Sequence, residues 1–472
     1  MSRLIVVSNR CVQQDDGYID PFITTLGQIF SKHPGLWFGW NGSVTAGKRS
    51  RSCNVTHHAH YATHGWDLSP NEYDNAYQGY VHNVLWPIFH NRPDLAAYKK
   101  EYFITWKSYN TDVARTVGAQ LRPDDRVWVH DYHLLAVGKQ LREDGHHNRC
   151  GFFLHQPFPP GEVIRAVPEH DTLMRALLHY DVIGFQSSAD INNFLSCVLR
   201  FYRAERIAGD TIQVNGRSIQ IGIFPCGIDT SGVGPSQATP QAVEEYQRQI
   251  IISNDVINDV SGIHYRLDAM RALINTWPHY VRGVSLLQIC DPAREYPWSS
   301  PDLCTRLERF CGEINGQYGD FTWYPVNYIH NALCKHELLS ALYARADVAL
   351  FTPLSEGMSL SAKAFILAQD PEDPGVLILS ACSGAAEQLT EALIVNPYDA
   401  RRTGEALHSA LAMPLHERRR RHSRLLAKVQ RYDCHWWAAA FLTALSGTAP
   451  PPPWQAAFRT SHHGVFTPQK LY

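Results

Sequence analysis

The stretch RVWVHDYHLLAVGKQLREDGHHNRCGFFLHQ, residues 126–156, contains two short apolar runs with an amphipathic segment between them. The apolar runs, RVWVHD and CGFFLHQ, are rich in Val, Trp and Phe, which is typical of strands buried on both faces of a parallel sheet. The segment between them, LAVGKQLREDG, has helical spacing. A strand, a helix and a second strand in this order predict two parallel strands joined by a crossover helix.

The same alternation continues in both directions and forms two blocks. The first block also contains the predicted strands RLIVVSN, DVIGFQ and IQIGIFPCGI and the helical segment DINNFLSCVLRFY. The second block begins near residue 249 with the predicted strands QIIIS, VSLLQIC, TWYPV, DVALFT and GVLILS, separated by helices such as RLDAMRALINTW and HELLSALYARA. The pattern predicts an α/β fold with two Rossmann-like, doubly wound domains that face a central cleft.

The composition is that of a globular protein and argues against several classes of function. The chain has 472 residues, of which 44% are hydrophobic and 19% charged, with a net charge of −2. It is long enough for two domains and lacks the basic balance of a dedicated nucleic-acid binder. No apolar run reaches the roughly 20 residues of a membrane span, and MSRLIVVSNR is predicted to be a buried strand. The 11 cysteines, with no CxxC pair, favour reduced thiols in a cytoplasmic protein.

Two local clusters have simpler explanations than a binding site. THHAHYATH places His57, His60 and His64 at spacings that a metal could use, but no HExxH or Cys/His framework accompanies them. We interpret this segment as a solvated strand and turn and expect no metal site. The basic run Arg418 to Arg421 favours a solvated helix face over an anion-binding patch.

Polar residues gather where the predicted strands end. In parallel sheets these ends meet at one edge, and ligands bind there. The motifs are SNR, HDYHLL, HQPFPP, CDPAR and PLSEGMSLSAKAF, which offer Arg10, His130, Asp131, His133, His155, Arg294 and Glu356. SACSGAAEQL repeats the pattern of a turn before a helix start, where unpaired N–H groups attract anions.

Together with GLWFGWNG, NVLWPIFH and the long run from LFTPLSEGMSLSAKAF to ALIVNPYD, these motifs resemble the trehalose-6-phosphate synthases over roughly residues 1–445. The resemblance implies a retaining glycosyltransferase with the GT-B fold. Members of that family join glucose from UDP-glucose to glucose 6-phosphate and need no metal. We therefore expect a sugar phosphate as a partner, no cofactor, no nucleic-acid or membrane partner, and a homo-oligomer.

The resemblance also sets the expected domain limits. We expect an acceptor domain over residues 1–240 and a donor domain over residues 241–432. A helix over residues 433–446 is expected to cross back to the first domain. GTAPPPPWQ marks the start of a proline-rich tail over residues 447–472.

The expected acceptor site looks complete. The resemblance implies that the sugar phosphate is held by Arg10, Tyr77, Trp86 and Arg294 and that Asp131 binds acceptor hydroxyls. Two arginines can grip a phosphate with charge-assisted hydrogen bonds, and aromatic faces suit a sugar ring. His155 matches a histidine beside the transferred sugar. We therefore expect His155, Glu356 and Asp131 to be the catalytic residues.

The expected donor site, in contrast, has lost several family residues. A Gly-Gly turn is replaced by Asp20 and Pro21, and the arginine and lysine that hold the diphosphate are replaced by Val256 and Ser261 in ISNDVINDVSG. The family motif DGMNLVAKE becomes EGMSLSAKA, in which the last glutamate is replaced by Ala364. The expected donor-binding positions of that motif are Glu356, Met358, Ser359, Leu360, Ser361 and Ala364.

These replacements can be weighed. Hydrogen bonds to charged groups contribute about 1.5–3 kcal/mol each, so two lost cations cost on the order of 3–6 kcal/mol, or roughly 10²- to 10⁴-fold in affinity. Asp255 and Asp259 are expected to add repulsion. A different gap placement would pair the missing arginine with Arg266, but it would break the helix expected after Gly262.

Three functions remain open on this basis. The main expectation is a divergent glycosyltransferase that couples a sugar phosphate such as glucose 6-phosphate to an atypical donor. The first alternative is an inactive glucose-6-phosphate-binding pseudoenzyme or a regulatory partner of an active synthase. The second alternative is an ordinary UDP-glucose-dependent trehalose-6-phosphate synthase in which other groups replace the donor contacts.

Overall fold

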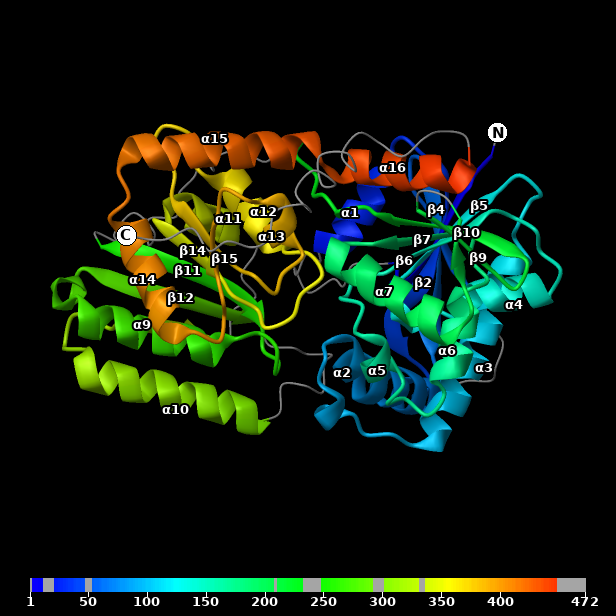
Figure 1. Ribbon diagram of the computed structural model, residues 1–472, viewed down its shortest axis with the longest axis horizontal. Coiled ribbons are helices and arrows are strands. Elements are labelled where there is room, and N and C mark those ends of the chain that lie inside the picture. Colours follow the sequence, from blue (N-terminus) through cyan, green and yellow to red (C-terminus); the bar gives the residue numbers. More distant parts are fainter. Residues whose placement is uncertain are drawn as a thin grey trace.

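The computed structural model describes residues 2–11, 21–46, 53–207, 210–231, 248–291, 301–330 and 336–447. These residues form two units, each built on a mostly parallel sheet with helices on its faces, and the two units lie side by side (Figure 1). The predicted α/β class with two doubly wound units is confirmed. The predicted limit at residues 240 and 241 falls outside the described residues, as does the predicted tail from residue 448 on.

The first sheet has ten strands in the order β3-β4-β2-β1-β5-β6-β7-β10-β9-β8. They are β1 (Leu4–Arg10), β2 (Gly35–Val44), β3 (Asn54–His57), β4 (Tyr61–Leu68), β5 (Arg126–His130), β6 (Cys150–Phe153), β7 (Val182–Phe185), β8 (Glu205–Arg206), β9 (Thr211–Val214) and β10 (Arg217–Ile223). The centre is parallel, and β1 pairs with β2 on one side and β5 on the other. The strand order reverses there, which is where such sheets bind ligands.

The second sheet has six strands in the order β13-β12-β11-β14-β15-β16, and all of its pairs are parallel. The strands are β11 (Gln249–Val256), β12 (Val284–Asp291), β13 (Val326–Ile329), β14 (Val348–Phe351), β15 (Val376–Ser380) and β16 (Leu393–Val395). Strand order reverses between β11 and β14, so a second ligand crevice is expected at their carboxyl ends.

Helices cover both sheets. Those of the first unit are α1 (Pro21–Ile29), the π-helix η1 (Glu72–Leu85), α2 (Trp86–Phe89), η2 (Pro93–Leu95), α3 (Lys100–Gly118), η3 (Tyr132–Leu134), α4 (Val137–Glu143), α5 (Gly161–Ile164), α6 (His170–Leu177) and α7 (Ser188–Phe201). Those of the second unit are α9 (Ile263–Thr276), η4 (Pro278–Tyr280), α10 (Pro301–Tyr318), α11 (His336–Arg345), α12 (Leu360–Ala368), α13 (Ala385–Gln388), α14 (Ala400–Leu411) and α15 (Leu415–Arg431).

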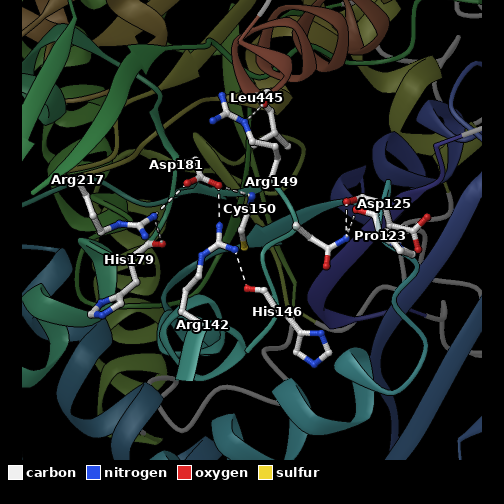
Figure 2. Close-up of polar contacts among 11 residues, drawn as sticks. Pro123, Asp125, Arg142, His146, Arg149, Cys150, His179, Asp181, Arg217 and Leu445 are labelled. Carbon is white, nitrogen blue, oxygen red and sulfur yellow. Dashed lines mark hydrogen bonds and ion pairs between the residues drawn. The ribbon is translucent and has the colours of Figure 1, made fainter. Parts of the chain in front are cut away.

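The last helix, α16 (Cys434–Ser446), follows the second unit in sequence but packs on the first sheet (Figure 1). The ring of Phe441 stacks on Trp128, with 4.6 Å between centroids. Trp437 lies against Phe153 at 5.1 Å. Arg149 donates from Nε to the carbonyl oxygen of Leu445 over 2.9 Å (Figure 2). The chain therefore connects the two units a second time at its end.

An ion-pair network connects the beginnings of the neighbouring strands β6, β7 and β10. Asp181 accepts from Arg142 over 2.7 Å and from Arg217 over 3.0 Å (Figure 2). The same carboxylate also accepts from the backbone N–H of Cys150 over 2.8 Å, at the start of β6. A charge shared between three elements fixes their relative position.

One strand prediction is wrong in its position along the chain. TWYPV covers residues 322–326, but β13 begins only at Val326. Asp320 accepts from both the backbone N–H and the hydroxyl of Thr322, which forms a turn. Trp323 is buried and its indole N–H donates to the Val284 carbonyl oxygen over 3.1 Å. Local side-chain bonding thus displaces the strand toward the carboxyl side.

The basic cluster matches its expected structure, and the histidine cluster does so only in part, because His64 of β4 is half-buried and stacks on Phe38 at 4.7 Å. His57 and His60 are exposed, in β3 and the turn before β4. The arginines from 418 to 421 lie on α15 and pair with carboxylates, namely Asp373, Glu372 and Glu417. This run is therefore an ion-paired helix face.

Candidate functional site

The predicted phosphate-binding side chain Arg10 ends β1 and lies over an aromatic ring. Its guanidinium carbon is 4.4 Å from the centre of the Trp40 ring, which comes from β2. Tyr77, from η1, packs edge-on against Trp40 at 5.0 Å. The cation–π contact with the buried Trp40 ring holds the guanidinium group of Arg10 at the carboxyl end of the sheet. The structure thus brings Arg10 and Tyr77 together and adds Trp40 to them.

Asp131 lies directly after β5, next to this group. Its backbone has φ +66° and ψ 164°, a conformation that residues with a Cβ rarely adopt. Burial raises the pKa of its carboxyl to about 7, although backbone amides of Tyr132 and His155 act in the opposite direction. A carboxyl that titrates near neutrality can donate as well as accept hydrogen bonds to sugar hydroxyls.

Neutral histidines surround Asp131. Nδ1 of His133 is 3.9 Å from the Asp131 carboxylate. Burial and the nearby charge of Arg10 lower the pKa of His133 to about 3. Nε2 of His155 is 3.1 Å from Nδ1 of His130, and burial lowers the pKa of His155 to about 3 as well. His155 is therefore a neutral imidazole whose Nε2 is held by a second histidine.

Of the other predicted acceptor residues, Trp86 lies within the described residues and Arg294 does not. Trp86 begins α2, is 7% exposed and stacks on His90 at 4.2 Å. Arg294, expected to hold the phosphate, and Asp20, expected in the donor turn, lie outside the described residues. Pro21 is the first residue of α1.

Glu356 lies in the loop between β14 and α12 and is held by the turn after β15. Its carboxylate accepts a hydrogen bond from the Ser383 hydroxyl over 2.8 Å. Burial raises the pKa of this carboxyl to about 7, and the negative charge of Asp255 acts in the same direction. The Ser383 bond and the positive charge of Arg266 oppose the shift.

The two units meet at this loop. Gly357 packs so closely on the carbonyl oxygen of His155 that a Cβ has no room, which places His155 beside the Glu356 loop. Lys363 of α12, fully buried, donates to the Cys226 carbonyl oxygen over 2.5 Å. Glu387 of α13 accepts from the backbone N–H and the hydroxyl of Ser188, at 2.9 and 2.7 Å. The catalytic candidates of both units therefore share one interface.

Asp255 is ion-paired, which weakens its part of the expected repulsion. Its carboxylate pairs with Arg266 over 2.7 Å and accepts from the Gln288 side chain over 2.9 Å. Arg266 is 0% exposed and also donates to the Ser261 carbonyl oxygen over 2.9 Å. Since α9 begins at Ile263, the rejected alternative alignment would indeed disrupt a helix. Arg266 is thus an internal counter-ion of Asp255.

Val256 and Ser261 stand at the places expected for the missing cations. Val256 is the last residue of β11, and Ser261 is buried, with its hydroxyl donating to the Asn258 carbonyl oxygen over 2.8 Å. Gly262, with φ +73°, then starts α9. The end of β11 therefore offers no side-chain cation at Val256 or Ser261 and keeps the partly exposed Asp259, and it is followed by a helix N-terminus, whose first amides favour an anion.

The remaining donor-motif residues form the start of α12. Ser359 is its N-cap residue and is buried, as is Met358, whereas Leu360, Ser361 and Ala364 are partly exposed. A second helix N-terminus thus follows directly after Glu356. Sequence reasoning missed Trp40, Lys363 and Ser383, although GLWFGWNG, SLSAKAF and SACSGAAEQL were all recognised.

Within the described residues, one group of potential metal ligands was found, Asp229, Cys434 and His435, with ligand atoms within 4.8 Å of one another. This group lies where α16 begins, in the part of the chain that returns from the second unit to the first. It is distant from Glu356 in the sequence. No helix in the described ranges has the length and apolar character needed to cross a membrane.

The chain resembles known glycosyltransferases along nearly its whole length. Residues 8–447 match the model of Glycosyltransferase family 20. A trehalose-6-phosphate synthase of Klebsiella pneumoniae is 35% identical over 459 residues, which are 95% of this chain and 96% of the relative. A trehalose-6-phosphate synthase of Citrobacter koseri is 36% identical with the same coverage.

Solved structures agree with this result. An α,α-trehalose-phosphate synthase (UDP-forming) from Burkholderia xenovorans, in complex with glucose-6-phosphate, has a TM-score of 0.88 at 34% identity, covering 94% of this chain and 100% of its own. An Escherichia coli structure bound with UDP-2-fluoro glucose has a TM-score of 0.89 at 34% identity, with 96% and 100% covered. The expected GT-B architecture is confirmed, and the chain belongs to glycosyltransferase family 20.

Proposed function

We propose that this glycosyltransferase is a UDP-glucose-dependent trehalose-6-phosphate synthase, with glucose 6-phosphate as the acceptor. The relatives support it, since curated proteins of this activity match 95% of the chain. The observation that carries the proposal is the meeting of His155 and the Glu356 loop across the two units, beside the group of Arg10, Trp40 and Tyr77. An acceptor site and a donor site then adjoin at one bond-forming position.

Each side chain has a physical role in the proposed reaction. Arg10 supplies the positive charge for the phosphate, and Asp131 binds acceptor hydroxyls. In the transfer, the bond from the glucosyl anomeric carbon to the diphosphate oxygen breaks, a bond to the acceptor hydroxyl oxygen forms, and the proton of that hydroxyl passes to the oxygen of the departing diphosphate. His155, held neutral, contacts the transferred glucose, and the carboxyl of Glu356 binds its hydroxyls. Holding the acceptor hydroxyl beside the anomeric carbon lowers the entropic part of the barrier.

The absence of cations at Val256 and Ser261 is compatible with UDP-glucose as the donor. Because Arg266 neutralises Asp255, the loop repels an anion less than its sequence indicates. The N-termini of α9 and α12 provide amide donors and positive dipole ends for a diphosphate. These groups support an ordinary donor that is held without the family arginine and lysine.

A second candidate function is transfer from a donor with less negative charge. One observation favours it: neither Val256 nor Ser261 offers a charge, and the nearby Arg266 is buried and paired with Asp255. A single substitution separates the candidates. Val256→Arg changes activity little if other groups already hold the diphosphate, whereas a gain of about 10-fold or more in UDP-glucose affinity supports the second candidate.

The direct test is incubation of the protein with UDP-glucose and glucose 6-phosphate, followed by mass spectrometry for trehalose 6-phosphate and an assay for released UDP. We expect both products, and their loss in Glu356→Gln and His155→Ala. A calorimetric titration with UDP-glucose at saturating glucose 6-phosphate should show micromolar binding. Absence of product and of binding would overturn the proposal.

A further inference from the structure

The turn between β15 and α13 contacts Glu356 through three hydrogen bonds. The backbone N–H of Glu356 donates to the Cys382 carbonyl oxygen over 3.2 Å, and Gly384 donates to the Glu356 carbonyl oxygen over 3.1 Å. The third bond runs from the Ser383 hydroxyl to the carboxylate, over 2.8 Å. The first two fix the backbone of Glu356, whereas the third acts on its carboxylate, which also has a hydrogen bond with the Ser359 side chain.

Ser383 is suited to hold one carboxylate position. The residue is 3% exposed, so water competes little with its hydroxyl. The turn itself is fixed, because Gly384 packs directly on the Gly357 backbone. Glutamate has one more rotatable bond than the aspartate expected at this position from the family motif, so its carboxylate has more orientations to lose on binding a ligand.

We propose that Ser383 is a positioning residue of the transferase: its hydroxyl holds the Glu356 carboxylate in the orientation that binds the donor sugar. This inference rests on the proposed function. It assigns to the β15–α13 turn a specific part in donor binding, and it explains how a glutamate can work in place of the shorter aspartate. Charged groups around the carboxylate are Asp255 and Arg266, and His155 faces the loop from the other unit.

The test compares Ser383→Ala with Ser380→Ala. Ser380 supplies a matched control, because its hydroxyl accepts from the Cys382 N–H over 2.9 Å and supports the same turn without touching Glu356. We expect Ser383→Ala to lower kcat/KM for UDP-glucose about 10-fold, with the KM for glucose 6-phosphate within about two-fold of wild type. Ser380→Ala should leave the balance between the two substrates unchanged.

Two further readouts distinguish positioning from support of the fold. The Ser383 bond favours the ionised carboxylate, so Ser383→Ala should move the acid limb of the pH–rate profile to higher pH, and Ser383→Thr should restore it. In a Glu356→Gln background, Ser383→Ala should change the calorimetric Kd for UDP-glucose less than two-fold. Equal losses in Ser383→Ala and Ser380→Ala with an unshifted profile, or multiplied losses in the double variant, would overturn the inference.

The proposed function can fail separately. If the wild-type protein forms no trehalose 6-phosphate, the contact is still read from thermal unfolding against pH. A carboxyl with a folded-state pKa raised to about 7 lowers stability as pH rises from its unfolded value toward 7. Ser383→Ala should extend this fall to higher pH, and Glu356→Gln should remove it. Identical pH dependence in wild type and Ser383→Ala would refute the positioning contact.

Discussion

Asp131 joins a strained backbone to a perturbed carboxyl at one position. Its φ of +66° with ψ of 164° lies in a region that essentially only glycine occupies without cost. The backbone N–H of Asp131 donates to the Phe153 carbonyl oxygen over 2.8 Å, which ties this conformation to the next strand of the sheet. The strain is kept at the residue that we propose binds the acceptor hydroxyls.

Replacing Asp131 separates its two properties. Asp131→Gly should be more stable than Asp131→Ala by about 1–3 kcal/mol, because only the alanine keeps the strained Cβ. Both variants should lose most transferase activity. Chemical denaturation measures the difference in stability, and product assays measure the loss. Equal stability of the two variants would show that the conformation carries no strain.

Single residues were predicted with uneven success, for a physical reason. The resemblance located Arg10, Asp131 and His155 at strand ends and Tyr77 in the segment before the WP motif, and the structure brings them near one another. The interpretation of Asp255 as a bare repulsive charge missed its counter-ion, because Arg266 lies 11 residues further along the chain, on α9. Ser383 was missed for the same reason: a partner across a turn leaves no local pattern in the sequence.

At the scale of elements, α16 depends on glycines in the sheet beneath it. A Cβ on Gly151, in β6, would lie 2.7 Å from the ring of Phe441. A Cβ on Gly184, in β7, would lie 2.9 Å from the same ring. Both glycines thus make a groove for one aromatic side chain, which positions α16 across two neighbouring strands.

Filling this groove should destabilise the docked helix. Gly151→Ala should lower the free energy of unfolding by about 1–3 kcal/mol, because the ring or the helix must shift. Gly316→Ala is a matched control within the exposed face of α10, where nothing lies within 4 Å of a new Cβ, and it should stabilise by about 0.5–1 kcal/mol. Urea denaturation measures both. An unchanged Gly151→Ala would contradict the close packing.

The elements themselves were largely predictable from periodicity. Nine of the ten quoted strand segments overlap strands at the expected places, since buried parallel strands have continuous apolar runs. The strand prediction for TWYPV was misplaced because Trp323 is buried although it lies in a loop. A buried aromatic residue in a loop cannot be told from a buried strand residue by residue type alone. The π-helix η1, which carries Tyr77, was not predicted either.

At the scale of the whole molecule, Glu387 closes the two units on each other. Its carboxylate accepts two hydrogen bonds at the N-terminus of α7, where the helix dipole favours a negative charge. The bond lies on α13, the helix that follows the Ser383 turn. One segment, residues 383–387, therefore contacts both Ser188 of the first unit and the carboxylate of Glu356.

Removing this contact should favour an open molecule. Glu387→Ala should have a larger radius of gyration by small-angle X-ray scattering without ligands, and its KM for UDP-glucose should rise about two- to ten-fold. Saturating UDP-glucose and glucose 6-phosphate should restore the compact form. Glu391→Ala is the control, since Glu391 pairs with Lys428 inside the second unit. A closed, unliganded Glu387→Ala protein would contradict this role.

The return of α16 has a consequence for the nascent chain at the ribosome. The first sheet is complete in sequence when β10 ends at Ile223. The helix that packs on it, α16, ends only at Ser446, which is 223 residues later. At roughly 5–20 residues per second, synthesis takes on the order of 10–45 s to cover that distance. Throughout this interval Trp128 and Phe153 lack their final aromatic neighbours, and the unfinished first unit offers chaperones an apolar surface that the finished protein no longer has.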